Sequence, residues 1–109
     1  MNFNEEKIRD FENLKQDISS RYPNPFKSLK KNTSYIEIKR KTDQYSDHLI
    51  GLFRELSNAG RLIVSRAESI EESIMLKQAT DDIIYDEISK YLVMDENYKF
   101  SQFNKNNEK

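Results

Sequence analysis

The sequence predicts an all-α fold, a small antiparallel bundle of three or four helices followed by a flexible C-terminal tail. Apolar residues recur at spacings of three and four over most of the chain, and just two glycines and two prolines interrupt its 109 residues. Charged residues reach 34%, against roughly 25% in average globular proteins, which suits a thin bundle with much surface per residue. We expect one helical domain over residues 1–94 and a flexible polar tail over residues 95–109.

The first predicted helix covers about residues 4–21. Its apolar positions form one stripe along a helix, at Ile8, Phe11, Leu14 and Ile18. Pro23 ends this helix, because the residue before a proline is pushed out of the helical region. The stretch YPNPFKSLKKN, residues 22–32, is predicted to be a structural turn in which Tyr22 and Phe26 hold the connector against the core.

Part of this turn resembles a short recognition peptide. The tripeptide Asn24-Pro25-Phe26 is similar to the Asn-Pro-Phe peptide that EH domains of endocytic adaptors bind. That use would require the side chain of Phe26 to point outward. A structural turn that packs on the core would instead direct this ring inward.

The second predicted helix has the clearest periodicity in the chain. It opens at SYIE, where Ser34 can cap the helix and Glu37, three positions later, can reach back in a capping box. Phe53 widens its apolar stripe, whose members follow at alternating spacings of four and three: Ile38, Thr42, Tyr45, Leu49, Leu52, Leu56 and Ala59.

The number of helices depends on Gly60 and Thr80. We favour a break at Gly60, as a left-handed cap, because an unbroken helix from Tyr35 onward would exceed about forty residues, against the usual ~8–20. A helix that continued through the glycine would lose ~1 kcal/mol. Thr80, which two aspartates follow, has the pattern of an N-terminal cap and would begin the last helix. If that boundary is only a kink, one helix covers residues 61–93.

The predicted tail contains three aromatic residues, Tyr98, Phe100 and Phe103. Two interpretations stay open for them. Either they fold back and cover the end of the bundle, or they form a short motif for a protein partner. The last six residues are all polar and are expected to be disordered.

Residue patterns for catalysis or for cofactor binding are missing from the sequence. His48 is the one histidine, and it directly follows Ser46 and Asp47, whose side chains diverge by about 100° per residue on a helix and so cannot form a triad. The chain has no cysteine, no carboxylate three or four residues from His48 and no glycine-rich phosphate loop. We therefore expect no enzymatic activity, cofactor, metal or small-molecule substrate.

Location is predicted from composition. The lack of cysteine suits a reducing compartment, and no apolar run approaches the ~18 residues of a membrane helix. The start MNFNEEKIRD lacks the apolar region of a signal peptide. We expect a cytoplasmic protein that does not enter a membrane.

Opposite charges gather in two segments, although the net charge is only −1. Residues 27–41 contain six basic side chains against Glu37, and residues 68–96 contain nine acids against two lysines. The two segments are expected to face each other, within one bundle or between chains. The contrasting interpretation is a surface for a polyanion, formed by Lys30, Lys31, Lys39, Arg40 and Lys41. Nucleic acid is the less favoured ligand, because the pI is near 5.9 whereas such domains usually exceed ~9.

The function that these patterns favour is a non-enzymatic helical protein–protein interaction module, an adaptor or small regulator. Because the core is thin, we expect another chain to complete the stripe of the second helix, in a homo-oligomer, a coiled coil or a complex with a helical partner. The predicted contact residues are Leu49, Leu52, Phe53 and Leu56. The alternatives are the polyanion-binding regulator and a small inhibitor of a protein target, since size and helical plan are similar to those of bacteriocin-immunity bundles.

Overall fold

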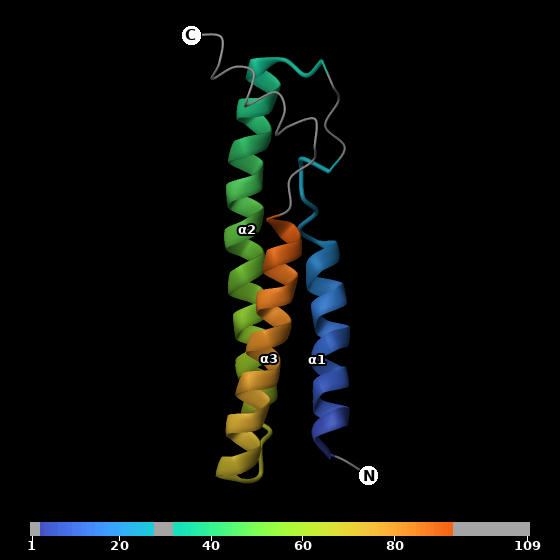
Figure 1. The fold of residues 1–109 in the computed structure, drawn as a ribbon, viewed down its shortest axis with the longest axis vertical. Coiled ribbons are helices and arrows are strands. Elements are labelled where there is room, and N and C mark those ends of the chain that lie inside the picture. Colours follow the sequence, from blue (N-terminus) through green and yellow to red (C-terminus); the bar gives the residue numbers. More distant parts are fainter. Residues whose placement is uncertain (1–2, 28–31, 93–109) are drawn as a thin grey trace.

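The protein folds into an antiparallel bundle of three helices (Figure 1). The computed structural model describes residues 3–27 and 32–92, and within these ranges it contains helices but no strand. The helices are α1 (Phe3–Ser20), α2 (Tyr35–Val64) and α3 (Ile70–Tyr91). Helices α1 and α3 run in the same direction and α2 runs opposite to both, so the predicted all-α bundle is confirmed. The predicted tail, residues 95–109, lies outside the described residues.

The N-terminus of α2 is capped as the sequence predicts. The hydroxyl of Ser34 accepts a hydrogen bond from the backbone N–H of Glu37 at 3.2 Å, which satisfies one of the free donors of the first turn. The carboxylate of Glu37 does not complete the capping box by reaching back. It pairs instead with Arg40, at 2.9 Å.

Both predicted helix boundaries inside the bundle are wrong. Helix α2 continues through Gly60 to Val64, and α3 passes through Thr80. Gly60 is buried where the two helices meet: a methyl group added to it would lie 3.5 Å from Cδ1 of Ile84 and 3.6 Å from the hydroxyl of Thr80. The Thr80 hydroxyl donates to the carbonyl of Leu76 at 2.8 Å, which is a bond inside a helix and not a cap. Gly60 and Thr80 therefore lie inside their helices, at the contact between α2 and α3, and neither of them ends a helix.

The turn between α2 and α3 lies at residues 65–69, so the alternative of one helix over residues 61–93 is also wrong. Ser69 caps α3, because its hydroxyl accepts from the backbone N–H of Glu72 at 3.0 Å. The carboxylate of Glu72 reaches back and accepts from the N–H of Glu68 at 2.9 Å. The spacing from Ser69 to Glu72 is thus a capping signal that the sequence contains.

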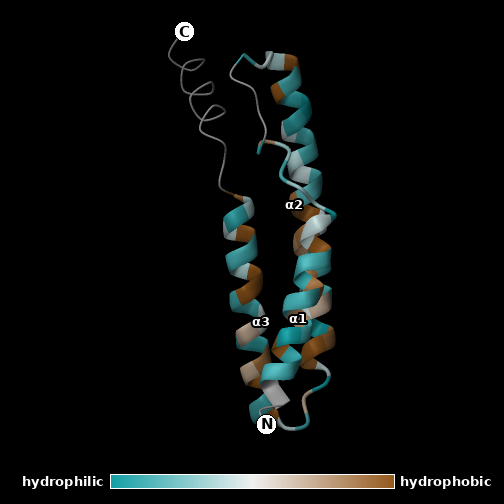
Figure 2. Ribbon diagram, turned by 90° about the vertical axis from the view of Figure 1, so that its right-hand side faces the viewer, coloured by the Kyte–Doolittle hydropathy of each residue, from teal (hydrophilic) through white to brown (hydrophobic). Residues whose placement is uncertain are grey.

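The core forms where the apolar stripes of the three helices and the connector between α1 and α2 meet. Hydrophobic and hydrophilic positions alternate along each helix, as one-sided stripes require (Figure 2). Phe11, Leu56 and Leu76 are fully buried and come one from each helix. The buried cluster consists of Phe11, Ile18, Phe26, Tyr45, Leu52, Leu56, Ala59, Ile63, Leu76, Ile84 and Tyr91.

The connector is held on the bundle by its aromatic residues. Phe26 is fully buried against Tyr45, with ring centroids 5.2 Å apart. The outward orientation that the likeness to an EH-domain ligand requires is therefore not found. The side-chain amide of Asn24 donates to the carbonyl of Tyr91 at 2.7 Å, and its oxygen accepts from the N–H of Phe26 at 2.8 Å. One asparagine thus fixes the turn and ties it to the end of α3.

Tyr22 holds the other side of the connector. Its ring lies against Gly51 of α2, where an added methyl group would approach Cε1 of Tyr22 to 2.5 Å. Its hydroxyl is hydrogen-bonded to the carboxylate of Glu55. One ring nitrogen of His48 lies 2.8 Å from the carbonyl of Pro23. The lack of a side chain at Gly51 thus leaves space on α2 for the ring of Tyr22. His48, also on α2, contacts the same connector.

Candidate functional site

A groove runs along the bundle between α2 and α3. The described residues that line the groove belong to α2 and α3 and to the C-cap residues of these two helices, Ser65 and Leu92. None of them belongs to α1. Three adjoining hollows make up the groove, and each of them shares Phe53 as a lining residue. The apolar residues of its walls are Leu49, Ile50, Phe53, Val64, Ile84, Tyr85, Ile88 and Leu92.

Several of these apolar side chains are exposed to solvent. The exposed fractions are 61% for Ile50, 56% for Phe53, 77% for Tyr85 and 50% for Leu92. Single exposed apolar residues are common on protein surfaces, but these four follow one groove and are drawn from both of its walls. A contiguous apolar strip of this kind is typical of a surface that binds another protein.

Charged residues accompany the apolar strip on both of its walls. The α2 wall carries Arg54 and Arg61, both exposed. The α3 wall carries Asp81 and Lys77, which form an ion pair with each other. Among the described residues, neither arginine forms an ion pair with a carboxylate, although Arg61 and Asp81 line the same hollow.

The residues predicted from the sequence to contact a partner do not share one surface in the structure. Leu52 and Leu56 are 1% and 0% exposed, because they pack inside the chain's own core, so they cannot contact a partner while the bundle is intact. Leu49 is half-buried against that core. Phe53, which widens the stripe, is exposed and lines all three hollows of the groove.

The α3 wall of the groove was missed by sequence reasoning. Tyr85, Ile88 and Leu92 follow at spacings of three and four, which is itself a helical stripe. The buried stripe of α3 contains Leu76, Ile84 and Tyr91. A helix that is apolar on two sides is a detectable signal, and here one of the sides faces solvent.

The basic segment does not pair with α3 in the described part of the chain. Lys30 and Lys31 lie outside the described residues, while Lys39, Arg40 and Lys41 lie on the N-terminal part of α2. In the described ranges, the ion pair found for these three residues is the one between Arg40 and Glu37. The expected contact between the two charged segments within one bundle is therefore not found there.

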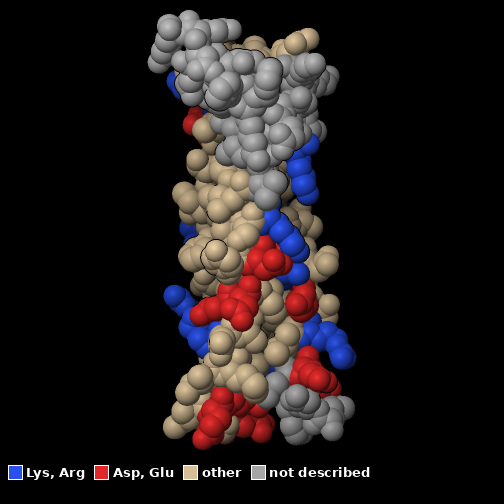
Figure 3. All heavy atoms as spheres, in the orientation of Figure 1, with Lys and Arg blue, Asp and Glu red and all other residues tan. Residues whose placement is uncertain are grey.

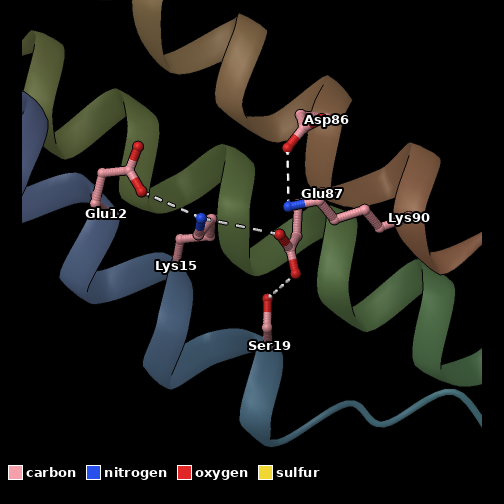
Figure 4. Close-up of polar contacts among 6 residues, drawn as sticks. All are labelled: Glu12, Lys15, Ser19, Asp86, Glu87 and Lys90. Carbon is pink, nitrogen blue, oxygen red and sulfur yellow. Dashed lines mark hydrogen bonds and ion pairs between the residues drawn. The ribbon is translucent and has the colours of Figure 1, made fainter.

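The acids of α3 are instead paired with α1 and with α3 itself. Lys7 contacts Glu72 at 2.6 Å, and Lys15 lies 4.0 Å from Glu87, whose carboxylate also accepts from Ser19 (Figure 4). Figure 3 shows acidic and basic side chains interspersed over the lower half of this face. These contacts fix α1 against α3 on the side away from the groove lining.

The surroundings of Glu72, Lys90 and Tyr91 shift the pKa values of these side chains, which lie outside the groove lining. The hydrogen bond from Lys7 lowers the pKa of Glu72, and the hydrogen bond to Asp86 raises the pKa of Lys90. Burial raises the pKa of Tyr91 to about 12, with a contribution from Tyr45, on which its ring stacks at 5.1 Å. The Tyr91 hydroxyl is buried and has no hydrogen-bond partner among the described residues.

The described ranges, 3–27 and 32–92, contain neither a candidate metal site nor a candidate membrane span. Their acidic and histidine side chains nowhere gather in a group of three that could hold a metal ion. None of their helices is both long and apolar enough to cross a membrane. In comparisons with known proteins, no family model, no curated protein and no solved structure matches the chain.

Proposed function

We propose that this chain is a non-enzymatic interaction module, an adaptor or small regulator, whose groove between α2 and α3 binds an amphipathic helix of a protein. The observation that carries the proposal is the exposed apolar strip along the groove, formed by Ile50, Phe53, Tyr85 and Leu92. We place this activity in the cytoplasm, a location supported by the lack of cysteine in the chain.

Helix-in-groove binding follows from the spacing of the strip. On the α3 wall, Tyr85, the half-buried Ile88 and Leu92 follow at intervals of three and four, and on the α2 wall Ile50 and Phe53 are three residues apart. This matches the spacing of apolar anchors on a bound helix. A helix bound in the groove would pack against both α2 and α3. It would become the fourth helix of the bundle, as in four-helix bundles. Burial of the strip supplies the driving force, at roughly 25 cal/mol per Å² of apolar surface.

The charged walls restrict which helix fits. Arg54 and Arg61 on the α2 wall favour acids along one edge of the bound helix. Asp81 on the α3 wall, which is paired with Lys77 of the same helix, favours a base along its other edge. Electrostatic complementarity of this kind sets orientation and selectivity more than affinity. An inhibitor of a protein target would use the same surface, so it is one form of this function.

The test is site-specific photo-crosslinking in the cells that encode the chain. A benzophenone amino acid replaces Tyr85 in the groove or, as the matched control, Tyr35 near the N-terminus of α2, which is also an exposed tyrosine. We expect a discrete adduct from position 85 alone, with the crosslinked peptide of the captured protein coming from an amphipathic helix. The same background adducts from both positions would contradict a docking groove.

A further inference from the structure

We infer that the groove binds a second copy of this chain, related to the first by a twofold axis that runs parallel to the helices. This inference rests on the proposed function, since it names the occupant of the same groove. It is based on residues that line the same hollow from opposite walls. Arg61 and Asp81 line one hollow in this way, and Phe53 and Tyr85 line another.

The symmetry determines which residues meet. A rotation of 180° about an axis along the groove exchanges its two walls but keeps every residue at its height. It therefore places α2 of each copy on α3 of the other. Because α2 and α3 run in opposite directions, the new neighbours are antiparallel, as in an up-down four-helix arrangement. Contacts of this type are isologous, so each contact occurs twice.

The charges of the groove become complementary under this rotation. Arg61, which has no carboxylate partner among the described residues, comes to face Asp81 of the second copy. Within residues 3–27 and 32–92, the ion pair of Asp81 is the one with Lys77 of its own helix, and an ionised carboxylate can accept from two cations. Every copy thus gains two ion pairs across the interface, one through its arginine and one through its aspartate.

The apolar residues match in the same way. Phe53 lines one hollow together with Tyr85 and Ile88, so the rotation brings the phenylalanine of each copy to the wall of the other that carries Tyr85 and Ile88. Ile50 and Leu92 line the next hollow and meet by the same operation. All four side chains are at least half exposed in the single chain. An unrelated helix would need a suitable edge of each sign, whereas a second copy of the groove supplies both.

The test reverses one charge in each of two variants. Arg61→Glu faces Asp81 of a second identical copy, and Asp81→Arg faces Arg61, so each variant alone meets two repulsive pairs. An equimolar mixture restores two attractive pairs, but only between unlike chains. If the substitutions acted only through repulsion between positions 61 and 81 of the same chain, mixing the two variants would not restore association. We measure association by sedimentation velocity at high micromolar concentration and identify mixed dimers by native mass spectrometry.

Two variants outside the groove are the controls. Asp86→Arg removes a similarly exposed ion pair of α3, the one with Lys90 four residues on, and Arg9→Glu reverses an exposed arginine of α1. Both are expected to associate like the wild type. Circular dichroism and thermal melting establish that all four variants are folded.

We expect the wild type to dimerise, each groove variant to raise the dissociation constant at least ~10-fold, and the mixture to form dimers of one chain of each kind. A monomeric wild type, unchanged association of the groove variants, or no recovery on mixing would each overturn the inference. If the wild type is monomeric while Tyr85 is crosslinked to another protein, the second copy is rejected and the proposed function stands. If the crosslink is also missing, both fail.

Discussion

The pair formed by α2 and α3 has two apolar faces that differ in what covers them. On one face, Leu56 and Leu76 are fully buried under α1, and Lys7 of α1 is paired with Glu72 of α3. On the other face, Phe53 and Tyr85 are more than half exposed. Both faces have helical spacing and similar residue types. The difference shows that periodicity finds the apolar positions of a helix but not which of them the same chain covers.

The largest contrast between the faces is expected from truncating one residue on each. Leu56→Ala leaves a cavity in the core and should lower the free energy of unfolding by ~2–5 kcal/mol. Phe53→Ala should change it by less than ~0.5 kcal/mol in a dilute monomeric sample, because its side chain is 56% exposed. Urea unfolding at low micromolar concentration measures both values. Equal losses would mean that the two faces are covered alike.

The two glycines of α2 sharpen the contrast, since one lies under the connector and the other in the groove. Gly51→Ala places a methyl group 2.5 Å from the ring of Tyr22, and the overlap should cost ~1–3 kcal/mol. Gly60→Ala meets its nearest neighbour at 3.5 Å, an ordinary contact, and should stabilise the helix by ~0.5–1 kcal/mol. Thermal melting of the two variants should therefore move in opposite directions. A loss of stability at Gly60 would show that α2 and α3 approach more closely than described.

A smaller effect is expected at Tyr91, on the covered side. Its pKa is raised from 10.0 to about 12, so the folded state keeps a proton that the unfolded state loses. The resulting stabilisation is complete below pH 10 and is lost as the pH rises through about 12. Tyr91→Phe should remove this part of the alkaline loss. At neutral pH it should leave stability unchanged or raised, because the buried hydroxyl has no described partner.

Chemical unfolding of the wild type and Tyr91→Phe at pH 8 and pH 11 tests this prediction. Tyr85→Phe at low micromolar concentration is the control, because it removes the same hydroxyl from a side chain that is 77% exposed in the single chain. If Tyr91→Phe lowers stability at neutral pH, its hydroxyl has a hydrogen-bond partner beyond the described residues.

Much of the fold follows from local signals in the sequence. Pro23 and Ser34 mark the end of α1 and the start of α2, because a proline and a capping serine act within a few residues. Gly60 and Thr80 were misinterpreted as helix ends, since a glycine at a cap and a glycine at a helix crossing look alike locally. The two residues face each other between α2 and α3, and that contact is visible only in three dimensions.

The site could be predicted only in part for a similar reason. Phe53 belongs to both the predicted surface and the observed groove, whereas Leu52, its neighbour, turns into the core. Which of two adjacent apolar positions on α2 is covered depends on the side of α2 against which α1 packs. The periodicity of the sequence does not determine that side. Tyr85 and Leu92 became part of the groove only once α3 was placed beside α2.

Hydroxyl-radical footprinting of Tyr85, with mass-spectrometric detection, tests most directly whether the open face is a docking surface. In the dilute single chain, Tyr85 and Tyr35 are both exposed and should be oxidised readily, while the buried Tyr45 should not. As the chain concentration rises, we predict that oxidation of Tyr85 falls severalfold while that of Tyr35 stays constant. Equal oxidation of Tyr85 at every concentration, and again after addition of the protein that is crosslinked at this position, would contradict a docking surface on this face.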